Sequence, residues 1–342
     1  PGAPPGVSPE KGGPDPFQID AVENGEGPLL VVAGPGTGKT FVIQHRVIHL
    51  ITKFGVAPEK ILCLTFTEKA AEEMRSRIEA ALAKADLKGR PNVATFHSFC
   101  DKLLREFPVE SDLPRDFRIL EGPRLLRFIM KRIDSFNLRY FRIRRSAIEF
   151  AEELERFVSR CHDELLSTAD AFERARRMSE QAATEEARQQ ARLFLELAEC
   201  KRMLEEELED GHFATFGELI TRTVALLESH PEVRAKLQER YLHLLVDEYQ
   251  DDNVAQSIYR FRGAHPKILR EFEDAWKAHG LKKVVLRQSY RSAPAVVAAS
   301  GALIGKSPAH DKEKVILPAE GKKGPPVRIV RTPDSDRQAA YI

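Results

Sequence analysis

The sequence predicts an α/β fold, in which helices cover both faces of a parallel sheet. A helical pattern over residues 17–24 precedes the short apolar run Leu29–Val32, and a helix from Lys39 to about Lys53 leads to the run Ile61–Leu64. Strands that alternate with helices in this way are typical of parallel sheets buried on both faces. A later run, Leu244–Val246, is apolar without alternation and therefore predicts a central parallel strand.

The middle of the chain has a different character. Its long charged helices carry apolar residues at steps of three and four, which indicates amphipathic helices, and they lack the strict heptad of a coiled coil. After it, the run Lys283–Leu286, which is apolar from Val284, predicts a strand that opens a second α/β unit. The expected divisions are a flexible tail over 1–14, a first α/β domain over 15–108 and 212–276, an all-helical insertion over 109–211, and a truncated second unit over 277–342.

Composition narrows the class of protein. The chain has 342 residues, which is more than a single hydrophobic core usually holds, so we expect more than one compact unit. Of these residues, 42% are apolar. The chain has 53 basic and 52 acidic residues, so its net charge is near zero and does not indicate a nucleic-acid partner. Any basic surface that binds nucleic acid must therefore be local. The four cysteines are scattered, which favours reduced thiols in a cytoplasmic protein. No apolar run approaches the ~20 residues that span a bilayer, so no membrane association is expected.

The strongest local pattern is AGPGTGKT, between the first predicted strand and the helix that follows it. A glycine-rich loop that opens a helix directs backbone N–H groups at a phosphate. Ala33 stands where the general pattern has glycine, but the flanking strand and helix are both present. We therefore predict a phosphate site for ATP, with Lys39 on the β- and γ-phosphates and Thr40 on Mg²⁺. The residues expected to bind ATP here are Ala33, Gly34, Gly36, Thr37, Gly38, Lys39 and Thr40.

A second pattern supplies the carboxylates that ATP hydrolysis needs. Asp247 and Glu248 directly follow the predicted strand Leu244–Val246. Asp247 would hold the Mg²⁺ ion, and Glu248 would orient or deprotonate the attacking water. Acidic residues at a strand end are by themselves a weak signal, since most are solvated. Together with the glycine-rich loop they predict an ATPase.

The segments around these two patterns resemble the UvrD/Rep/PcrA-type superfamily 1 DNA helicases from about residue 15 to 305. Several short motifs occur in the order of that family, which makes the resemblance more specific than any one of them. They are PFQIDAV (16–22), LTFTEKAAEEMRSRI (64–78), TFHSF (95–99), VDEYQD (246–251), QSIYRFRGA (256–264) and QSYRS (288–292).

The resemblance implies RecA-like motor domains that use ATP and Mg²⁺ to move 3′-to-5′ along single-stranded DNA. Gln18 would read adenine, although a capping or core glutamine is the plainer alternative. Gln256 would sense the γ-phosphate, while Tyr290 and Arg291 would reach the nucleotide from the second motor domain. The residues expected to contact DNA are Phe66, Thr95, His97, Tyr259, Phe261 and Arg262. The expected partners are single-stranded DNA, single-strand/duplex junctions, and proteins of repair or recombination.

Some positions depart from the family. Glu68 stands where asparagine is usual, and because an acid repels phosphates we expect it to point away from DNA. Ser289 also replaces an asparagine, and Phe261 lies near a usual tryptophan. Outside the motifs, residues 124–145 combine eight basic residues with interleaved aromatics. This pattern, the basic stripe, favours a surface that contacts DNA. The alternative is an amphipathic helix whose basic residues pair with the acidic helices at 149–210.

The family's later motifs have no counterpart, so we expect an incomplete motor that does not unwind duplex DNA alone. The same motifs also occur in the motor part of AddA/RecB-like helicase-nucleases. A fragment that binds nucleotide and DNA without acting as a motor is a third hypothesis. Finally, the spacing between Glu248 and Ser257 is too short for the helix and core strand that the family has there. We therefore predict that residues are missing between about Asp251 and Ser257.

Overall fold

The computed structural model describes residues 13–141, 147–249, 268–306, 315–328 and 330–331. The chain divides into two compact units, each formed from separate stretches of sequence. The first comprises Pro1–Pro58, Glu73–Arg90 and Leu245–Ile342, and the second comprises Glu59–Glu72 and Pro91–Leu244.

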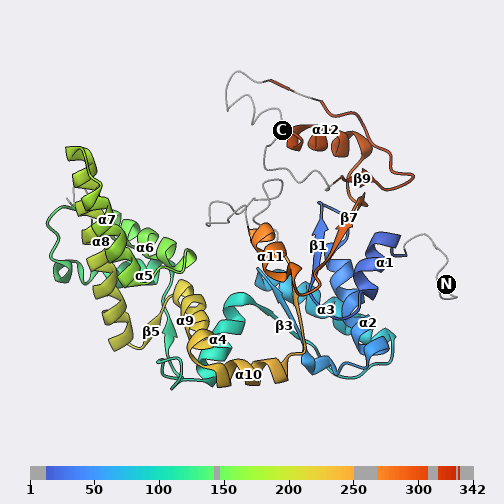
Figure 1. The fold of residues 1–342 in the computed structure, drawn as a ribbon, viewed down its shortest axis with the longest axis horizontal. Coiled ribbons are helices and arrows are strands. Elements are labelled where there is room, and N and C mark those ends of the chain that lie inside the picture. The colour runs from blue at the N-terminus through green and yellow to red at the C-terminus, as the bar shows by residue number, and fades with distance from the viewer. Residues whose placement is uncertain (1–12, 142–146, 250–267, 307–314, 329, 332–342) are drawn as a thin grey trace. The chain divides into compact units, whose positions relative to one another are not determined.

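The first unit is built around two parallel strands. Strand β1, Leu29–Ala33, pairs with β7, Lys282–Leu286, in the register Leu29↔Lys282 to Ala33↔Leu286. Helices α1 (Pro16–Glu23) and α2 (Lys39–Phe54) lie beside this pair (Figure 1). Apolar side chains from all four elements pack into one core, which removes them from water and fixes the ends of β1 and α2. That core consists of Ala21, Ala33, Val42, Val284 and Leu286.

The place of β7 differs from the sequence expectation. We expected this strand to open a second α/β unit, and instead it pairs with the strand that precedes the glycine-rich loop. An apolar run without alternation fits a buried parallel strand in either unit, so periodicity alone cannot choose its partner. The residues after it include α12, Pro294–Ile304, and the short parallel pair β8 (Gln288–Ser289) and β9 (Leu317–Pro318).

Three further strands form a separate sheet with the order β3-β2-β6. These strands are β2 (Ile61–Thr65), β3 (Asn92–Thr95) and β6 (His243–Val246), and β2 is buried along its whole length. Among the described residues β6 lies at an edge, and Leu244 is 60% exposed. In the described residues β6 therefore has a neighbouring strand on one side only, whereas a central strand has one on each side. Mixed α/β structure with parallel sheets is confirmed, but in the described ranges the strands do not join into one sheet.

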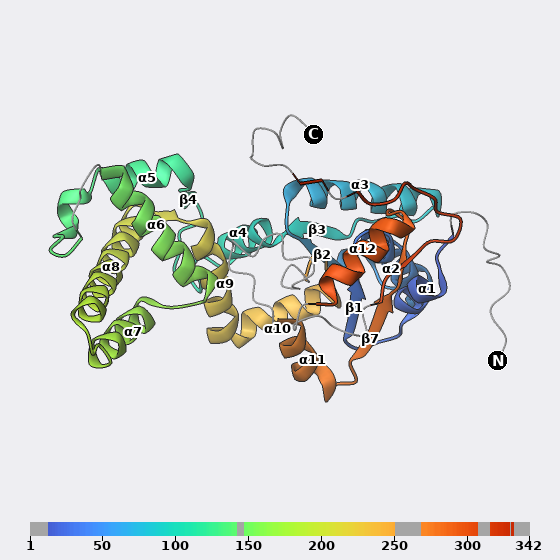
Figure 2. The same cartoon turned by 90° about the horizontal axis from the view of Figure 1, so that it is seen from above.

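The expected insertion is helical apart from β4 (Arg118–Ile119) in its described residues, and β4 pairs with β5 (Phe213–Ala214). Figure 2 shows helices α5, α6 and α8 close together, and their apolar side chains form one core. Buried residues of this core include Phe128, Phe150 and Leu204. The helices of the second unit beyond β3 are α4 (Phe96–Glu106), α5 (Gly122–Met130), α6 (Ala147–Asp163), α7 (Thr168–Glu180), α8 (Glu185–Asp210), α9 (Phe216–Ser229) and α10 (Pro231–Arg240).

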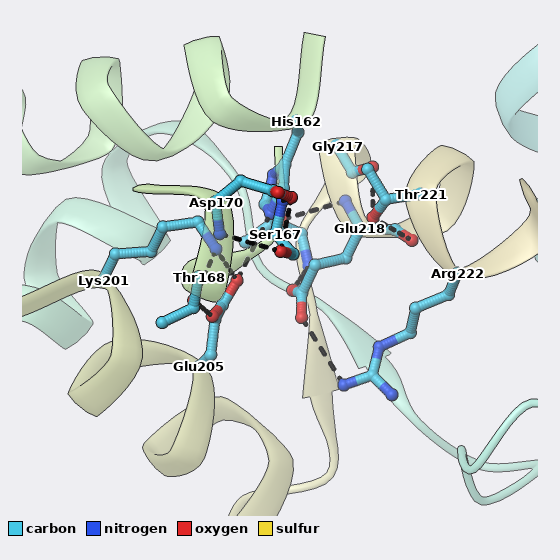
Figure 3. A network of polar contacts seen from close by, with 11 residues as sticks. His162, Ser167, Thr168, Asp170, Lys201, Glu205, Gly217, Glu218, Thr221 and Arg222 are labelled. Carbon is cyan, nitrogen blue, oxygen red and sulfur yellow. Dashed lines mark hydrogen bonds and ion pairs between the residues drawn. The ribbon is translucent and has the colours of Figure 1, made fainter. Parts of the chain in front are cut away.

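A buried polar network connects three of these helices (Figure 3). Lys201 of α8 is only 1% exposed, and its Nζ donates to Thr168 Oγ1 at 2.9 Å and to the Glu205 carboxylate. The Thr168 hydroxyl donates to the same carboxylate, and His162 Nε2 lies 3.7 Å from it. Because a buried charge is costly without partners, this set fixes α6, α7 and α8 relative to one another.

The cysteines are free and buried, which agrees with the expectation of structural thiols. Burial raises the pKa of the Cys100, Cys161 and Cys200 thiols, and a thiol with a raised pKa is less reactive. Among the described helices, none combines the length and apolar character needed to cross a membrane.

Candidate functional site

The glycine-rich loop connects β1 to α2 and is held open by its backbone. Gly36 and Gly38 have φ of 76° and 87°, in the left-handed region where a side chain is strained. The Thr37 hydroxyl donates to Gly34 O at 2.9 Å, which closes the turn. Gly38 is the N-cap of α2, and no side chain caps that end. The first N–H groups of α2 are thus left for an anion, and the helix dipole favours negative charge there.

Lys39 is the first residue of α2, and its ammonium faces the end of β6. Its Nζ lies 3.4 Å from Glu248 Oε2, which joins the loop to the carboxylate pair across 209 positions of sequence. Glu248 itself has φ of 60°, an unusual value for a residue with a side chain. Such strain is often found at functional positions, where the surroundings hold the residue in place.

Asp247 is the buried member of the carboxylate pair, with 7% of its surface exposed. Its Oδ1 accepts from Glu248 N at 3.0 Å. Burial, and then the nearby charge of Glu248, raise the pKa of Asp247, while Lys39 partly opposes this. A carboxylate that is costly to ionise in the free protein suits a cation site, because a bound Mg²⁺ would compensate its charge.

Gln18 lies against the loop from the α1 side. Its Nε2 donates to Thr37 O at 2.9 Å, and its Oε1 accepts from Asp15 N at 3.1 Å. A Cβ on Gly38 would come within 2.6 Å of that Nε2, so only glycine leaves room for this contact. Gln18 is 3% exposed and therefore takes the capping arrangement that we had kept as the alternative to adenine contact.

The segment 288–291 packs on the same loop from the other side. Tyr290 N donates to Gly36 O at 2.8 Å, and Ser289 Oγ donates to Pro35 O at 3.1 Å. A Cβ on Gly36 would lie 2.3 Å from Arg291 Cβ, so the two backbones touch there. The structure thus brings Tyr290 and Arg291 to the residues predicted to bind phosphate.

The residues predicted to contact DNA lie in the second unit where they are described. Thr95 is the buried N-cap of α4, Phe66 is half-buried after β2, and the His97 ring packs against Phe216 with centroids 5.1 Å apart. The Thr95 hydroxyl donates to Glu68 Oε1 at 2.8 Å. Glu68 therefore lies beside one of these residues, and its expected orientation away from DNA stays a prediction.

Several predicted residues fall outside the described ranges. They are Gln256, Ser257, Tyr259, Phe261 and Arg262, together with the stretch from Asp251 where we predict missing sequence. Of the basic stripe, Arg142, Arg144 and Arg145 also lie outside them.

The described part of the stripe divides into two kinds of residue. Its apolar members serve the helical core, where Phe128 and Phe136 are buried. Arg132 pairs with Glu207 at 2.7 Å and lies 3.6 Å above the Phe128 ring, as an intramolecular role requires. By contrast, three basic side chains on or just after α5 are exposed, namely Arg124, Arg127 and Lys131.

Asp15 is a residue that the sequence predictions missed. Its Oδ1 accepts from the backbone N–H groups of Phe17 and Gln18, and its Oδ2 accepts from the Tyr290 hydroxyl at 2.7 Å. That Asp15 caps α1 could have been predicted from the sequence. An Asp directly before Pro16, with Gln three positions later, is a pattern typical of a helix start. The hydrogen bond to Tyr290 could not have been predicted from the residues around Asp15, because Tyr290 lies 275 positions away in the sequence.

Comparisons with known proteins agree with the motifs. Residues 15–256 match the family model described as the UvrD/REP helicase N-terminal domain. The chain is 33% identical over 352 residues to an ATP-dependent DNA helicase PcrA of Leuconostoc citreum, covering 95% of this chain and 43% of that protein. It is 30% identical to DNA helicase II of Haemophilus influenzae, over 92% of this chain and 43% of the relative. It is 28% identical to the ATP-dependent DNA helicase Rep of Escherichia coli, over 96% and 48%.

The extent of these matches has two consequences. The chain spans less than half the length of these curated relatives. The match to the Leuconostoc citreum protein runs over 352 residues, which is more than the 342 of this chain, so that relative carries positions without a counterpart here.

Proposed function

Because this chain belongs to the UvrD/REP helicase N-terminal domain family, we propose that it is part of an ATP-driven DNA helicase motor. The motor would move 3′-to-5′ along single-stranded DNA and act at single-strand/duplex junctions in repair or recombination. The observation that carries the proposal is the contact between Lys39 and Glu248, which sets a phosphate-binding lysine beside a strand-end carboxylate pair.

The residues around that contact fit ATP and Mg²⁺. The open N-terminus of α2 and the left-handed Gly36 and Gly38 suit the phosphates. Thr40 and Asp247 would hold Mg²⁺, which when bound neutralises charge on the phosphates. Glu248 would accept a proton from the attacking water or orient it.

The base and γ-phosphate roles belong to the same proposal. Tyr290 would stack on adenine and Arg291 would stabilise charge on the phosphates, which their position on the glycine-rich loop supports. Gln18 is 3% exposed with both amide atoms bonded within the chain, so reading adenine would require it to exchange one of these partners. Gln256 would couple the γ-phosphate to the DNA side.

DNA would be held largely without regard to sequence. Phe66, Tyr259 and Phe261 would stack bases, while Thr95, His97 and Arg262 would contact the backbone. Within this set, the buried hydroxyl of Thr95 is already engaged with Glu68, and a DNA phosphate would have to compete with that bond.

The proposal is tested with ATP and single-stranded DNA. Lys39→Ala should abolish ATP binding or turnover, because it removes the cation on the phosphates. In the full-length protein, Glu248→Gln should still bind ATP but hydrolyse it about 10²–10⁴-fold more slowly, as expected for loss of a general base. Near-normal turnover by Glu248→Gln would remove that role from Glu248.

Two other functions share this site. An AddA/RecB-like helicase-nuclease would carry a nuclease signature further along the natural protein, which sequencing its gene would reveal. A regulatory fragment would bind nucleotide without turnover, so DNA would not stimulate ATP hydrolysis. The ATPase assay with and without single-stranded DNA separates that function from a motor.

A further inference from the structure

Asp15 connects two segments that lie 275 positions apart in sequence. One carboxylate oxygen caps α1 by accepting from Phe17 N at 2.8 Å and Gln18 N at 2.9 Å. The other accepts from the Tyr290 hydroxyl at 2.7 Å. With 8% of its surface exposed, Asp15 has little contact with water, and both of its oxygens are bonded within the chain.

Asp15 holds two residues that were expected on the base side of the nucleotide, and of these Gln18 has both amide atoms bonded within the chain. Through the capping box it fixes Gln18, whose amide then reaches Thr37 O in the glycine-rich loop. Through the phenol it fixes Tyr290, whose backbone N–H binds Gly36 O in the same loop. Burial, followed by the bond to Asp15, raises the pKa of the Tyr290 hydroxyl, so it stays protonated as the donor.

The phosphate cradle does not depend on Asp15 in the same way. Lys39 pairs with Glu248, and Thr37 closes its own turn on Gly34. Neither contact involves the Asp15 carboxylate. Loss of the carboxylate should therefore disturb the base side and spare the phosphate side.

We propose that Asp15 is a positioning residue that fixes Tyr290 for the base of ATP. This role rests on the proposed nucleotide site and deepens it. A substitution of Asp15 should therefore change the affinity for ATP but not the affinity for inorganic tripolyphosphate, which has no base. A residue needed only for folding would change both.

Substitutions can separate the cap from the bond to Tyr290. Serine is as good an N-cap as aspartate but is too short to reach the phenol, so Asp15→Ser keeps α1 and loses the connection. Asparagine is long enough for both, so Asp15→Asn should restore the role. Tyr290→Phe loses the hydroxyl and keeps the ring. Asp20→Ser is the matched control, since Asp20 lies on the same helix and pairs with Lys282 at 2.6 Å.

The experiment measures dissociation constants of the chain 1–342 for Mg-ATP and for inorganic tripolyphosphate by titration calorimetry. Asp15→Ser and Tyr290→Phe should each weaken ATP binding about tenfold, as expected for loss of a hydrogen bond to a charged group. The double variant should lose no more than either single one, because both remove the same bond. Tripolyphosphate affinity should stay within about twofold, and Asp15→Asn and Asp20→Ser should resemble the unmodified chain.

Three results would overturn the assignment. ATP affinity unchanged in Asp15→Ser would show that the bond positions nothing, and an equal loss for both ligands would make the role structural. Additive losses in the double variant would mean that the two residues act separately. Lys39→Ala distinguishes failure of the site itself. If it leaves both affinities unchanged, or if the unmodified chain binds neither ligand, the proposed nucleotide site is wrong and Asp15 loses its role with it.

Discussion

Asp247 is almost removed from water at the point where the candidate site needs a negative charge. A carboxyl group whose pKa is raised on folding favours the folded state when protonated, so its contribution to stability is lost as the pH rises through the folded pKa. At neutral pH the ionised group therefore destabilises the free protein. This is the usual compromise of a binding site, in which a group held ready for a ligand costs stability.

Asp247→Asn should consequently stabilise the protein without Mg²⁺ by about 1 kcal/mol at pH 7, because it removes a buried charge. The gain should disappear below the ordinary carboxyl range, where Asp247 is protonated in both states. Chemical unfolding at several pH values measures this, and Mg²⁺-dependent ATP binding should be lost in the same variant. An equally large gain at pH 3 would mean that charge is not the cause.

At the scale of elements, the network in Figure 3 is a buried polar connection between α6, α7 and α8. Burial raises the pKa of Glu205, but hydrogen bonds from His162, Lys201 and Thr168 more than offset this and hold it at about 2. A lowered carboxyl pKa stabilises the fold above the unfolded value, and this contribution is lost as the pH falls toward the folded value.

Glu205→Gln should therefore cost about 3 kcal/mol of unfolding free energy at pH 7, and the cost should vanish between pH about 4.5 and about 2. Denaturant unfolding monitored by helical circular dichroism measures the difference. Glu206→Gln is the control, because Glu206 is the next residue of α8 and is exposed beside Arg202. If both variants lose equally, or if the loss does not depend on pH, the network is not what stabilises these helices.

The exposed basic residues of α5 give a second prediction at this scale. If Arg124, Arg127 and Lys131 bind DNA phosphates, reversing all three to Glu should weaken binding and flatten its salt dependence. The slope of log affinity against log salt should become shallower by about one for each phosphate that the variant no longer neutralises. Fluorescence anisotropy of labelled DNA over a salt series measures this.

A matched control reverses Arg176 and Arg177 of α7, which both pair with Glu173. Their reversal should change the DNA salt slope less. If the α5 variant binds like the unmodified chain at every ionic strength, this face is not a DNA surface.

For the whole molecule, the strand pair β1-β7 and the strands β3-β2-β6 form separate sheets in the described residues, and the spacing after Glu248 is short. Among the described strands β1 and β6 each lie at the edge of their sheet, so an additional core strand could pair with either of them. The match over 352 residues shows that this relative carries positions without a counterpart in the 342 residues of this chain.

We therefore expect the natural gene to encode additional residues between Asp251 and Ser257. Sequencing the coding region from Val246 to Ile258 in the source DNA checks this directly. If the codons are contiguous, the deletion is genuine. The chain would then be a degenerate ATPase, and DNA would not stimulate its ATP hydrolysis.

The local structure and the chemical class of the site were predictable from the sequence alone. The strands over Leu29–Val32 and Ile61–Leu64, the helix from Lys39 and the long helices of the insertion all form where the patterns predict them. These features depend on periodicity and turn chemistry within a few residues, which a sequence displays directly. Lys39, Asp247 and Glu248 were identified because a glycine-rich loop and a strand-end carboxylate pair occur together.

The tertiary structure decided which distant residues meet. Four such contacts join segments 27 to 275 positions apart. They are the pairing of β7 with β1, the pairing of β6 with β2, the bond between Asp15 and Tyr290, and the contact of Glu68 with Thr95. The residue pattern of an apolar strand does not specify which strand it pairs with. A carboxylate likewise does not specify which donor it will accept from. Those choices follow from the packing of the whole chain, because a buried group takes whichever partner the fold brings within bonding distance.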